Sequence, residues 1–221
     1  MTALADWQAE VGGRLLVGDR PALPETGTPA GRAGWPITLA LYRQWRLFRI
    51  RSLAPLTVVR LGERSDLVVD AYLAANPGST SYASTDAAAF LRFAASAAPE
   101  DRYLDEITFL ELALIRARRP AGSDLLPASG YLARSRRATL RIVPFPAIRL
   151  MLWLAGLGDR PHETTGGVPA LIAPAVAGWV RPATAAEAAV WHWLAMQRPH
   201  HLVPGCWAEP LDSLRAAGAV H

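Results

Sequence analysis

The spacing of hydrophobic residues changes character near the middle of the chain. Up to about Arg119, apolar residues recur at intervals of three and four, which predicts amphipathic helices separated by short breakers. From Ala138 onward, short β-rich runs are followed by helical segments. We therefore predict an α+β protein with a helical domain over residues 1–120, a linker over 121–137 and a mixed domain over 138–221.

The first half predicts a small helical bundle. The expected helices are 3–16, a segment from Pro36 to Pro55, 67–75, 87–97 and a helix opened by Asp101 that ends near Arg119, with 18–34 as an exposed connector. Asp66 is the expected cap of the third helix, and Thr85 or Asp86 that of the fourth. Between Pro36 and Pro55, one apolar stripe is expected to face the core, made of Ile37, Leu41, Trp45 and Phe48.

The second half predicts three strands, at 138–144, 168–173 and 176–181. Thr184 and Glu187 have the spacing of a capping box, which marks the start of the next helix. A last helix is expected over 209–217, before Gly218. If 176–181 is extended, Val176, Gly178 and Val180 share one face and Trp179 lies on the other.

Composition narrows the class of protein. Half of the 221 residues are hydrophobic, which favours a folded chain, and all 23 basic residues are arginines. The arginine bias is typical of a high-GC genome. The net charge of +4 permits an acidic partner without requiring one. One cysteine, Cys206, and the lack of a signal-like N-terminus favour a soluble, cytoplasmic protein.

No residue pattern indicates catalysis. The chain has no glycine-rich phosphate loop, no Gly-x-Ser-x-Gly and no His-x-x-x-His. The only cluster with metal-ligating types is His192, His200, His201 and Cys206, and its spacing fits no standard site. Glu111 lies on an apolar stripe, where a carboxylate paired with an arginine is the simpler interpretation than a general base. We therefore expect no catalytic residue, metal or cofactor in this chain.

Two arginine runs are candidate interaction surfaces. Arg43, Arg46, Arg49 and Arg51 are interleaved with Trp45 and Phe48, and Arg134, Arg136, Arg137 and Arg141 precede or enter the first strand. For the first run, arginine and aromatic residues are frequent at interface hot spots, whereas the simpler interpretation is a solvated face over a packed core. The second run could clamp an acidic peptide or a partner protein, or it could be simple surface charge. The residues we predict at a partner interface are Arg43, Arg46, Arg136 and Arg137.

A series of residues along the chain resembles a known family. They are Leu4, Gln8, Tyr42, Arg49, Leu53, Leu61-Gly62, Tyr72, Pro77, Phe90, Tyr103-Leu104-Asp105-Glu106-Ile107 and Leu110-Glu111. In this order they resemble the HvfC-like and BufC-like partner subunits of multinuclear non-haem iron oxidative enzymes in the biosynthesis of ribosomally made, post-translationally modified peptides (RiPPs). The similarity extends over nearly the whole chain, and its individual motifs are loose.

The resemblance implies a subunit that is not itself catalytic. Such partners bind the precursor peptide and present it to the iron enzyme, which modifies cysteine. It also implies a C-terminal winged-helix-like RiPP recognition element of three strands and three helices. There the leader peptide adds as a strand beside the third strand, against the third helix, by ordinary strand addition. The residues expected to contact the peptide are Val176, Gly178, Val180, Arg181, Leu211, Leu214 and Arg215.

An alternative function is a winged-helix DNA-binding regulator, which a basic chain also permits. The expected last helix is a poor recognition helix because it carries one arginine, two acidic residues and no Asn or Gln. We therefore expect a heterodimer with an iron enzyme and a bound precursor peptide, with iron on the partner and no membrane or nucleic-acid contact.

Overall fold

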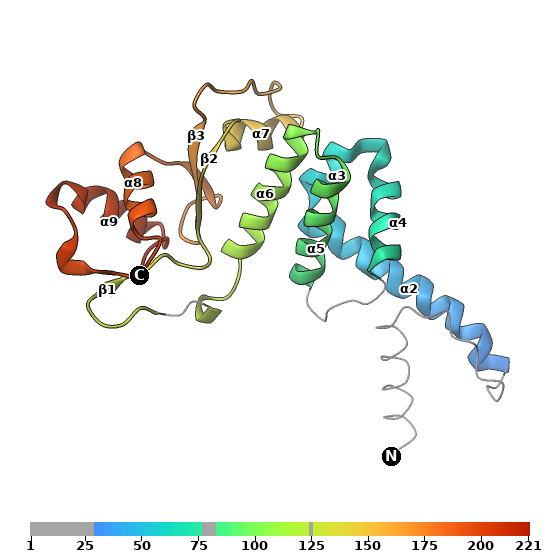
Figure 1. Ribbon diagram of the computed structural model, residues 1–221. Helices are drawn as coiled ribbons and strands as arrows, with labels where there is room; N and C mark the ends of the chain where they lie inside the picture. Colours follow the sequence, from blue (N-terminus) through green and yellow to red (C-terminus); the bar gives the residue numbers. More distant parts are fainter. Residues whose placement is uncertain (1–28, 77–82, 124–125) are drawn as a thin grey trace, which may run out of the picture. The chain divides into compact units, whose positions relative to one another are not determined.

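The computed structural model describes residues 29–76, 83–123 and 126–221, and the expected helix at 3–16 lies outside these ranges. The chain divides into two compact units, Met1–Pro99 and Glu100–His221. The described residues form α-helices and small antiparallel sheets (Figure 1), so the expected α+β class is confirmed. Among them, no helix combines the length and apolar character needed to cross a bilayer.

The division between the units falls earlier than the sequence suggested. We expected a helical domain to residue 120 and a linker at 121–137, but α6 (Arg102–Ala117) belongs to the second unit. The N-terminal cap of α6 is as expected, since Asp101 accepts a hydrogen bond from the Leu104 amide at 3.1 Å. Glu106 of α6 then pairs with Arg141 of β2 (Thr139–Val143) at 3.0 Å. This contact fixes α6 to the sheet, although its sequence pattern matches that of the earlier helices.

The described part of the first unit is helical. Its elements are α2 (Pro29–Leu53), α3 (Pro55–Leu61), a 3₁₀ turn at Gly62–Arg64, α4 (Ser65–Ala75) and α5 (Ala83–Ala97). The break before Pro55 and the end of α4 at Ala75 follow the sequence signals. Helix α2 begins at Pro29, so residues 29–34 are helical and not part of a connector as expected. Asp86 lies inside α5 and is buried, so it does not cap that helix.

The apolar stripe of α2 is not buried, which corrects the sequence prediction. Leu41 and Phe48 are 66% and 69% exposed, and Ile37 and Trp45 are also exposed. Helix α2 contacts α5 through its other side, where Ile50 is fully buried. Periodicity identified the apolar face correctly, but it could not show that the neighbouring helix packs against a different face.

The second unit contains a three-stranded antiparallel sheet in the order β2-β3-β4. Strands β2 and β3 (Val168–Ile172) confirm the first two expected strands. Strand β4 covers only Val180–Pro182, shorter than the expected 176–181. Gly178 and Trp179 both have φ of +69°, a left-handed conformation that turns the chain between β3 and β4.

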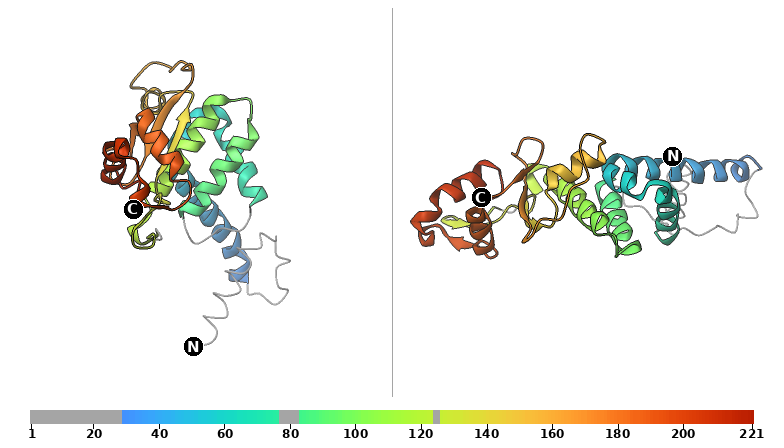
Figure 2. Two further views of the ribbon diagram at one scale, coloured as in Figure 1. Left: turned by 60° about the vertical axis from the view of Figure 1, so that its left-hand side comes forward. Right: turned by 90° about the horizontal axis from the view of Figure 1, so that it is seen from above.

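Helices cover both faces of this sheet. Helices α8 (Ala185–Trp193) and α9 (Ala208–Ala216) share a hydrophobic core with Leu140 and Leu171 on one face. On the other face α6 contacts β3, and α7 (Ala147–Leu154) contacts β4. Figure 1 views the sheet nearly edge-on between these helices, and the view from above in Figure 2 gives the same order of layers.

The segment expected to be a linker is built into the second unit. Strand β1 (Tyr131–Leu132) pairs with β5 (Arg198–Pro199), and a bridge joins Arg134 to Val220. A 3₁₀ turn at Ala121–Ser123 precedes β1. Between α8 and α9 the chain forms two further 3₁₀ turns, at His200–Leu202 and Gly205–Trp207. Residues 138–221 thus contain the three strands β2, β3 and β4 and the three α-helices α7, α8 and α9, with α7 between β2 and β3 and the other two after the sheet.

Candidate functional site

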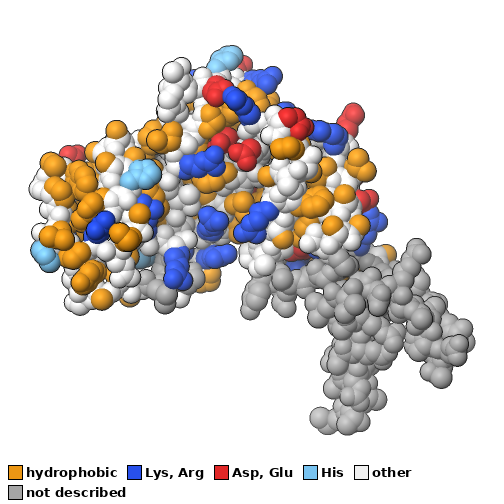
Figure 3. Space-filling view, viewed as in Figure 1, with side chains coloured by type: hydrophobic (Ala, Val, Ile, Leu, Met, Phe, Trp, Pro, Cys, Tyr) orange, Lys and Arg blue, Asp and Glu red, His pale blue; other side chains and the backbone are white. Residues whose placement is uncertain are grey.

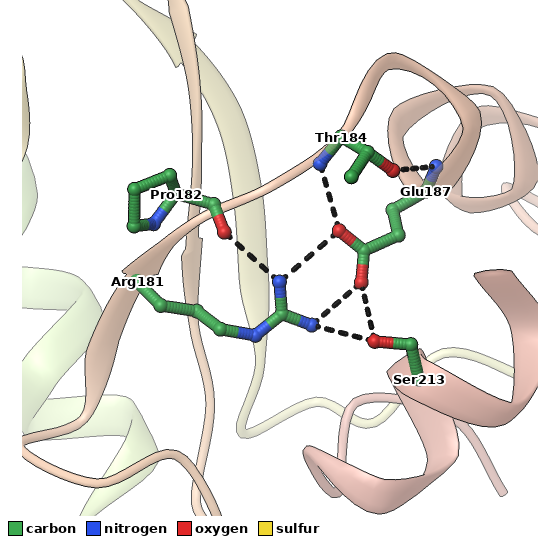
Figure 4. Close-up of polar contacts among 5 residues, drawn as sticks. All are labelled: Arg181, Pro182, Thr184, Glu187 and Ser213. Atoms are coloured by element: carbon green, nitrogen blue, oxygen red, sulfur yellow. Dashed lines mark hydrogen bonds and ion pairs between the residues drawn. The ribbon is translucent and has the colours of Figure 1, made fainter.

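Arg181 lies at the centre of the predicted peptide site and is held by an ion pair. Its position opposite Leu171 and, beyond it, Leu140 places it on the sheet face that α8 and α9 cover. Its Nη2 donates to Glu187 Oε1 at 2.6 Å and its Nη1 to Glu187 Oε2 at 3.1 Å. Ser213 of α9 donates to the same carboxylate at 2.7 Å (Figure 4). One carboxylate therefore joins β4, α8 and α9.

Local sequence fixes the position of this carboxylate. The predicted capping box is present, since Thr184 Oγ1 accepts from the Glu187 amide and Glu187 accepts from the Thr184 amide at 2.7 Å. Burial alone would raise the pKa of Glu187. The hydrogen bonds from Arg181, the Thr184 amide and Ser213 outweigh burial and lower that pKa to about 2. The ionised carboxylate is thus part of the folded state at neutral pH.

The other residues predicted to bind peptide do not form one exposed surface, which corrects the sequence prediction. Val180, Leu211 and Leu214 are buried, and the last two belong to the core between the sheet and the helices. Val176 packs against that core, and Gly178 lies in the turn before β4. Only Gly178 and Arg215 are exposed, and Arg215 pairs with Asp212 of the same helix at 3.4 Å.

The outer edge of β4 offers little backbone for an added strand. The Ala173 amide bonds to Trp179 O and the Ala183 amide to Pro169 O, so Arg181 also directs its backbone groups toward β3. Val180 and Pro182 therefore direct theirs outward. Proline has no N–H, and its carbonyl accepts from Arg181 Nη1 at 2.9 Å. Val180 is therefore the one residue of β4 whose backbone N–H and C=O are both available for hydrogen bonds to an added strand.

The opposite edge of the sheet is longer. Because alternate residues of β3 bond to β4, Val168, Ala170 and Ile172 bond to β2. Their partners are Val143, Arg141 and Thr139, so Leu140 and Ile142 direct N–H and C=O away from the sheet. In the described part of the chain no strand pairs with that side of β2. Ile142 is itself 50% exposed at this edge.

The four arginines predicted at a partner interface differ in exposure. Arg43 is exposed and pairs with Asp70. Arg136 is exposed, and Arg137 is partly buried with Nη2 donating to the Ala117 carbonyl at 3.1 Å. Arg46 is only 2% exposed, so its predicted contact with a partner is incompatible with this structure.

Arg46 instead completes a buried polar cluster between α2, α4 and α5. Its Nη2 and Nε donate to Asp86 at 2.8 and 3.0 Å, and Tyr72 Oη donates to the same carboxylate at 2.7 Å. Burial raises the pKa of Tyr72, and its hydrogen bond to Asp86 adds to that rise. Burial would also raise the pKa of Asp86, but the bonds from Arg46 and Tyr72 lower it overall. The cluster is structural.

The sequence interpretation missed a grouping of arginines from two segments. The bond from Arg137 to the Ala117 carbonyl brings the end of α6 beside the start of β2. The exposed Arg118 and Arg119 therefore lie near Arg136 and Arg137, and we call these four residues the basic rim. The two runs are visible in the sequence, but Arg118 and Arg119 were assigned to a helix end and Arg136 and Arg137 to a linker, so no proximity between them was expected.

A hollow of about 850 Å³ lies between α7 and the 158–165 loop. Arg149, His162 and Thr164 line it, and so does Arg160, whose guanidinium lies 4.7 Å from the Tyr103 ring centre. No hollow was expected here, because the segment that forms α7 was an ambiguous apolar run in the sequence and residues 158–167 were expected to be a polar loop. Its lining contains no pair of groups arranged as nucleophile and base.

The features described above that could contact a ligand are the outward N–H and C=O groups at the edge of β2 and the arginine side chains of the basic rim. Glu111 is buried in α6. Within the described residues, no three His, Cys, Asp or Glu side chains group closely enough to hold a metal ion, His192, His200, His201 and Cys206 included. Searches of family models and of curated proteins found no match to this chain.

Proposed function

We propose that this chain is a non-catalytic partner subunit of a multinuclear non-haem iron oxidative enzyme, and that it binds a ribosomally made precursor peptide. The observation that carries the proposal is the order of elements in the second unit. An antiparallel sheet β2-β3-β4 is followed by α8 and α9, as in a winged-helix-like recognition element. Both outer strands of that sheet lack a strand partner in the described residues, and such edges accept extended peptides.

The exposed side of α2 supports the expectation of a protein partner. Leu41, Trp45 and Phe48 follow one another at helical spacing and are exposed. Arg49 stacks on Trp45 with its guanidinium 3.4 Å from the ring centre. Aromatic residues and arginine on a contiguous apolar surface are typical of protein interfaces. In this proposal the iron enzyme covers this side of α2, and iron belongs to that enzyme.

Equilibrium binding of the purified chain tests the peptide-binding function. The probes are fluorescently labelled products of short reading frames next to its gene, and a labelled DNA duplex is the comparison. We expect one peptide to bind with a dissociation constant in the micromolar range or below, and DNA to bind only weakly. Binding of duplex DNA with a steep loss on adding salt, without binding of any peptide, would contradict the proposal.

The second candidate function is DNA binding, which the basic rim favours. Four arginines near one another form the positive surface that a nucleic-acid backbone requires. Helix α9, however, carries Glu209 and Asp212 against a single arginine, Arg215. A helix of that charge is poorly suited to the major groove, so we rank peptide binding first.

A further inference from the structure

We propose that the outer edge of β2, beside the basic rim, is a strand-addition site for an acidic, extended peptide segment. The site differs from the β4 edge that the family resemblance implies. It rests on the proposed function only in that a peptide is the natural ligand, and it specifies where and by what chemistry the peptide is held.

The backbone of β2 provides the hydrogen bonds. Leu140 and Ile142 direct two N–H and two C=O groups away from β3, at the two-residue spacing that a neighbouring strand requires. At β4 only Val180 directs both groups outward, because Pro182 has no N–H and its carbonyl accepts from Arg181. An added strand would thus make about four bonds at β2 and about two at β4.

The side chains near β2 provide the charge. Between Arg116 and Arg141 the sequence has seven arginines and one acidic residue, Asp124. Figure 3 shows arginine side chains gathered along β2 and the segment that leads into it. The exposed Arg118 and Arg119 have no side-chain hydrogen bond or ion pair within the described part of the chain. Their positive charge is thus available to a carboxylate from outside.

The outward backbone groups of β2 together with the neighbouring arginines favour a peptide over a nucleic acid as the ligand. A row that alternates N–H and C=O matches the backbone of another peptide, whereas its carbonyl oxygens repel phosphate oxygens. The arginines then favour glutamate or aspartate at the end of the peptide that lies near the basic rim. Ile142, 50% exposed, offers an apolar contact to side chains on one face of the added strand.

The test uses the full chain and a labelled 12-residue peptide of alternating threonine and glutamate, with the threonine–lysine peptide as its control. Ile142→Pro removes one outward N–H of β2, and an edge proline with its N on the solvent side leaves the β2–β3 bonds in place. We expect this change to weaken binding of the peptide about tenfold or more. The hydrogen bond from the residue 142 amide is lost, and the proline ring keeps the peptide backbone from approaching β2 closely. Arg118→Glu with Arg119→Glu should weaken it by a similar factor.

Arg64→Glu is the control for a charge reversal elsewhere, because Arg64 is exposed on the first unit. It changes the net charge by half as much as the double variant does. It should leave the affinity within about twofold, after allowance for net charge. Circular dichroism checks that each variant folds. If Ile142→Pro does not fold, amide exchange on the wild-type chain decides, since bound peptide should slow exchange at Leu140 and Ile142 and leave Val180 unchanged.

Three results would overturn the inference. They are no binding of the acidic peptide, equal binding by wild type and Ile142→Pro with no protection of β2 amides, and stronger binding of duplex DNA at the same arginines. The proposed function fails separately. If a native precursor peptide bound Ile142→Pro as tightly as wild type, the proposed peptide-binding function would stand and only its location at the β2 edge would be refuted.

Discussion

Arg181 and Glu187 form a two-point ion pair, with Nη2–Oε1 and Nη1–Oε2 distances of 2.6 and 3.1 Å. The carboxylate is 3% exposed and the arginine 29%. Arg181 was predicted to bind peptide, yet in the structure its guanidinium neutralises a buried charge of its own unit. Changes at Arg181 are therefore expected to act on stability first.

Arg181→Ala should lower the free energy of unfolding by about 2–3 kcal/mol, because Glu187 then remains buried without its cation. Chemical denaturation followed by tryptophan fluorescence measures the change. Arg215→Ala is the control, since its pair with Asp212 is exposed, and should cost less than about 0.5 kcal/mol. A stable Arg181→Ala protein with weakened peptide binding would return Arg181 to the binding site.

The pair also predicts a dependence of stability on pH. The folded pKa of Glu187, about 2, lies below its ordinary value of 4.5, so the ionised carboxylate stabilises the fold above about pH 4.5. That contribution is lost as the pH falls from about 4.5 to 2. Glu187→Gln should cost about 3 kcal/mol at pH 7 and progressively less over that window. An equal difference between the two proteins at pH 7 and pH 2.5 would contradict this account.

The buried pair of the first unit predicts a larger effect. Asp86→Asn leaves the Arg46 charge without its carboxylate at a site where both side chains are 2% exposed, and should cost about 3–5 kcal/mol. Asp70→Asn is matched in chemistry but removes the exposed pair with Arg43, and should cost less than about 1 kcal/mol. Thermal unfolding of both variants measures the contrast, and equal melting temperatures would show that the cluster contributes no more than a surface pair.

Glu106 should behave in the opposite way to Glu187. Burial raises the pKa of Glu106, Arg141 opposes the rise, and its Oε2 has no hydrogen-bond partner. A raised folded pKa means that the ionised form costs stability at neutral pH, and this cost disappears as the pH falls through the folded pKa. Glu106→Gln should therefore leave the free energy of unfolding at pH 7 unchanged or raise it by up to about 1 kcal/mol. A loss comparable to that of Glu187→Gln would show that the pair with Arg141 outweighs burial.

The turn before β4 gives a test of backbone strain. Gly178 has φ of +69° and open space where a Cβ would lie, so Gly178→Ala adds strain without a clash. We expect a loss of about 1–2 kcal/mol. Gly205→Ala also meets open space but has no positive φ, and should change stability by less than about 0.5 kcal/mol. Equal losses in the free energy of unfolding for Gly178→Ala and Gly205→Ala, measured by chemical denaturation, would contradict the left-handed conformation of Gly178.

Signals that act within a few residues predicted structure well. The Thr184–Glu187 capping box, the Asp101 cap and the strands β2 and β3 all follow from local residue patterns and appear in the structure. Strand β4 was predicted too long because the alternation of small and apolar residues did not reveal the positive φ at Trp179.

Relationships between distant segments could not be predicted in the same way. The apolar face of α2 was identified, but burial depends on where α5 packs. Arg46 reads as a surface residue, and only its tertiary partner Asp86, forty residues away, explains its burial. For the candidate site, the strand edges depend on register, and the basic rim depends on the contact of Arg137 with the end of α6.

The most direct test of the proposed function is to tag the full chain in its own host, purify it under native conditions and determine the mass and metal content of what accompanies it. We predict a complex with one iron-containing enzyme and a short acidic peptide, with the iron on the enzyme subunit. Recovery of the chain alone, or with DNA and no iron protein, would contradict its assignment as a peptide-presenting partner subunit.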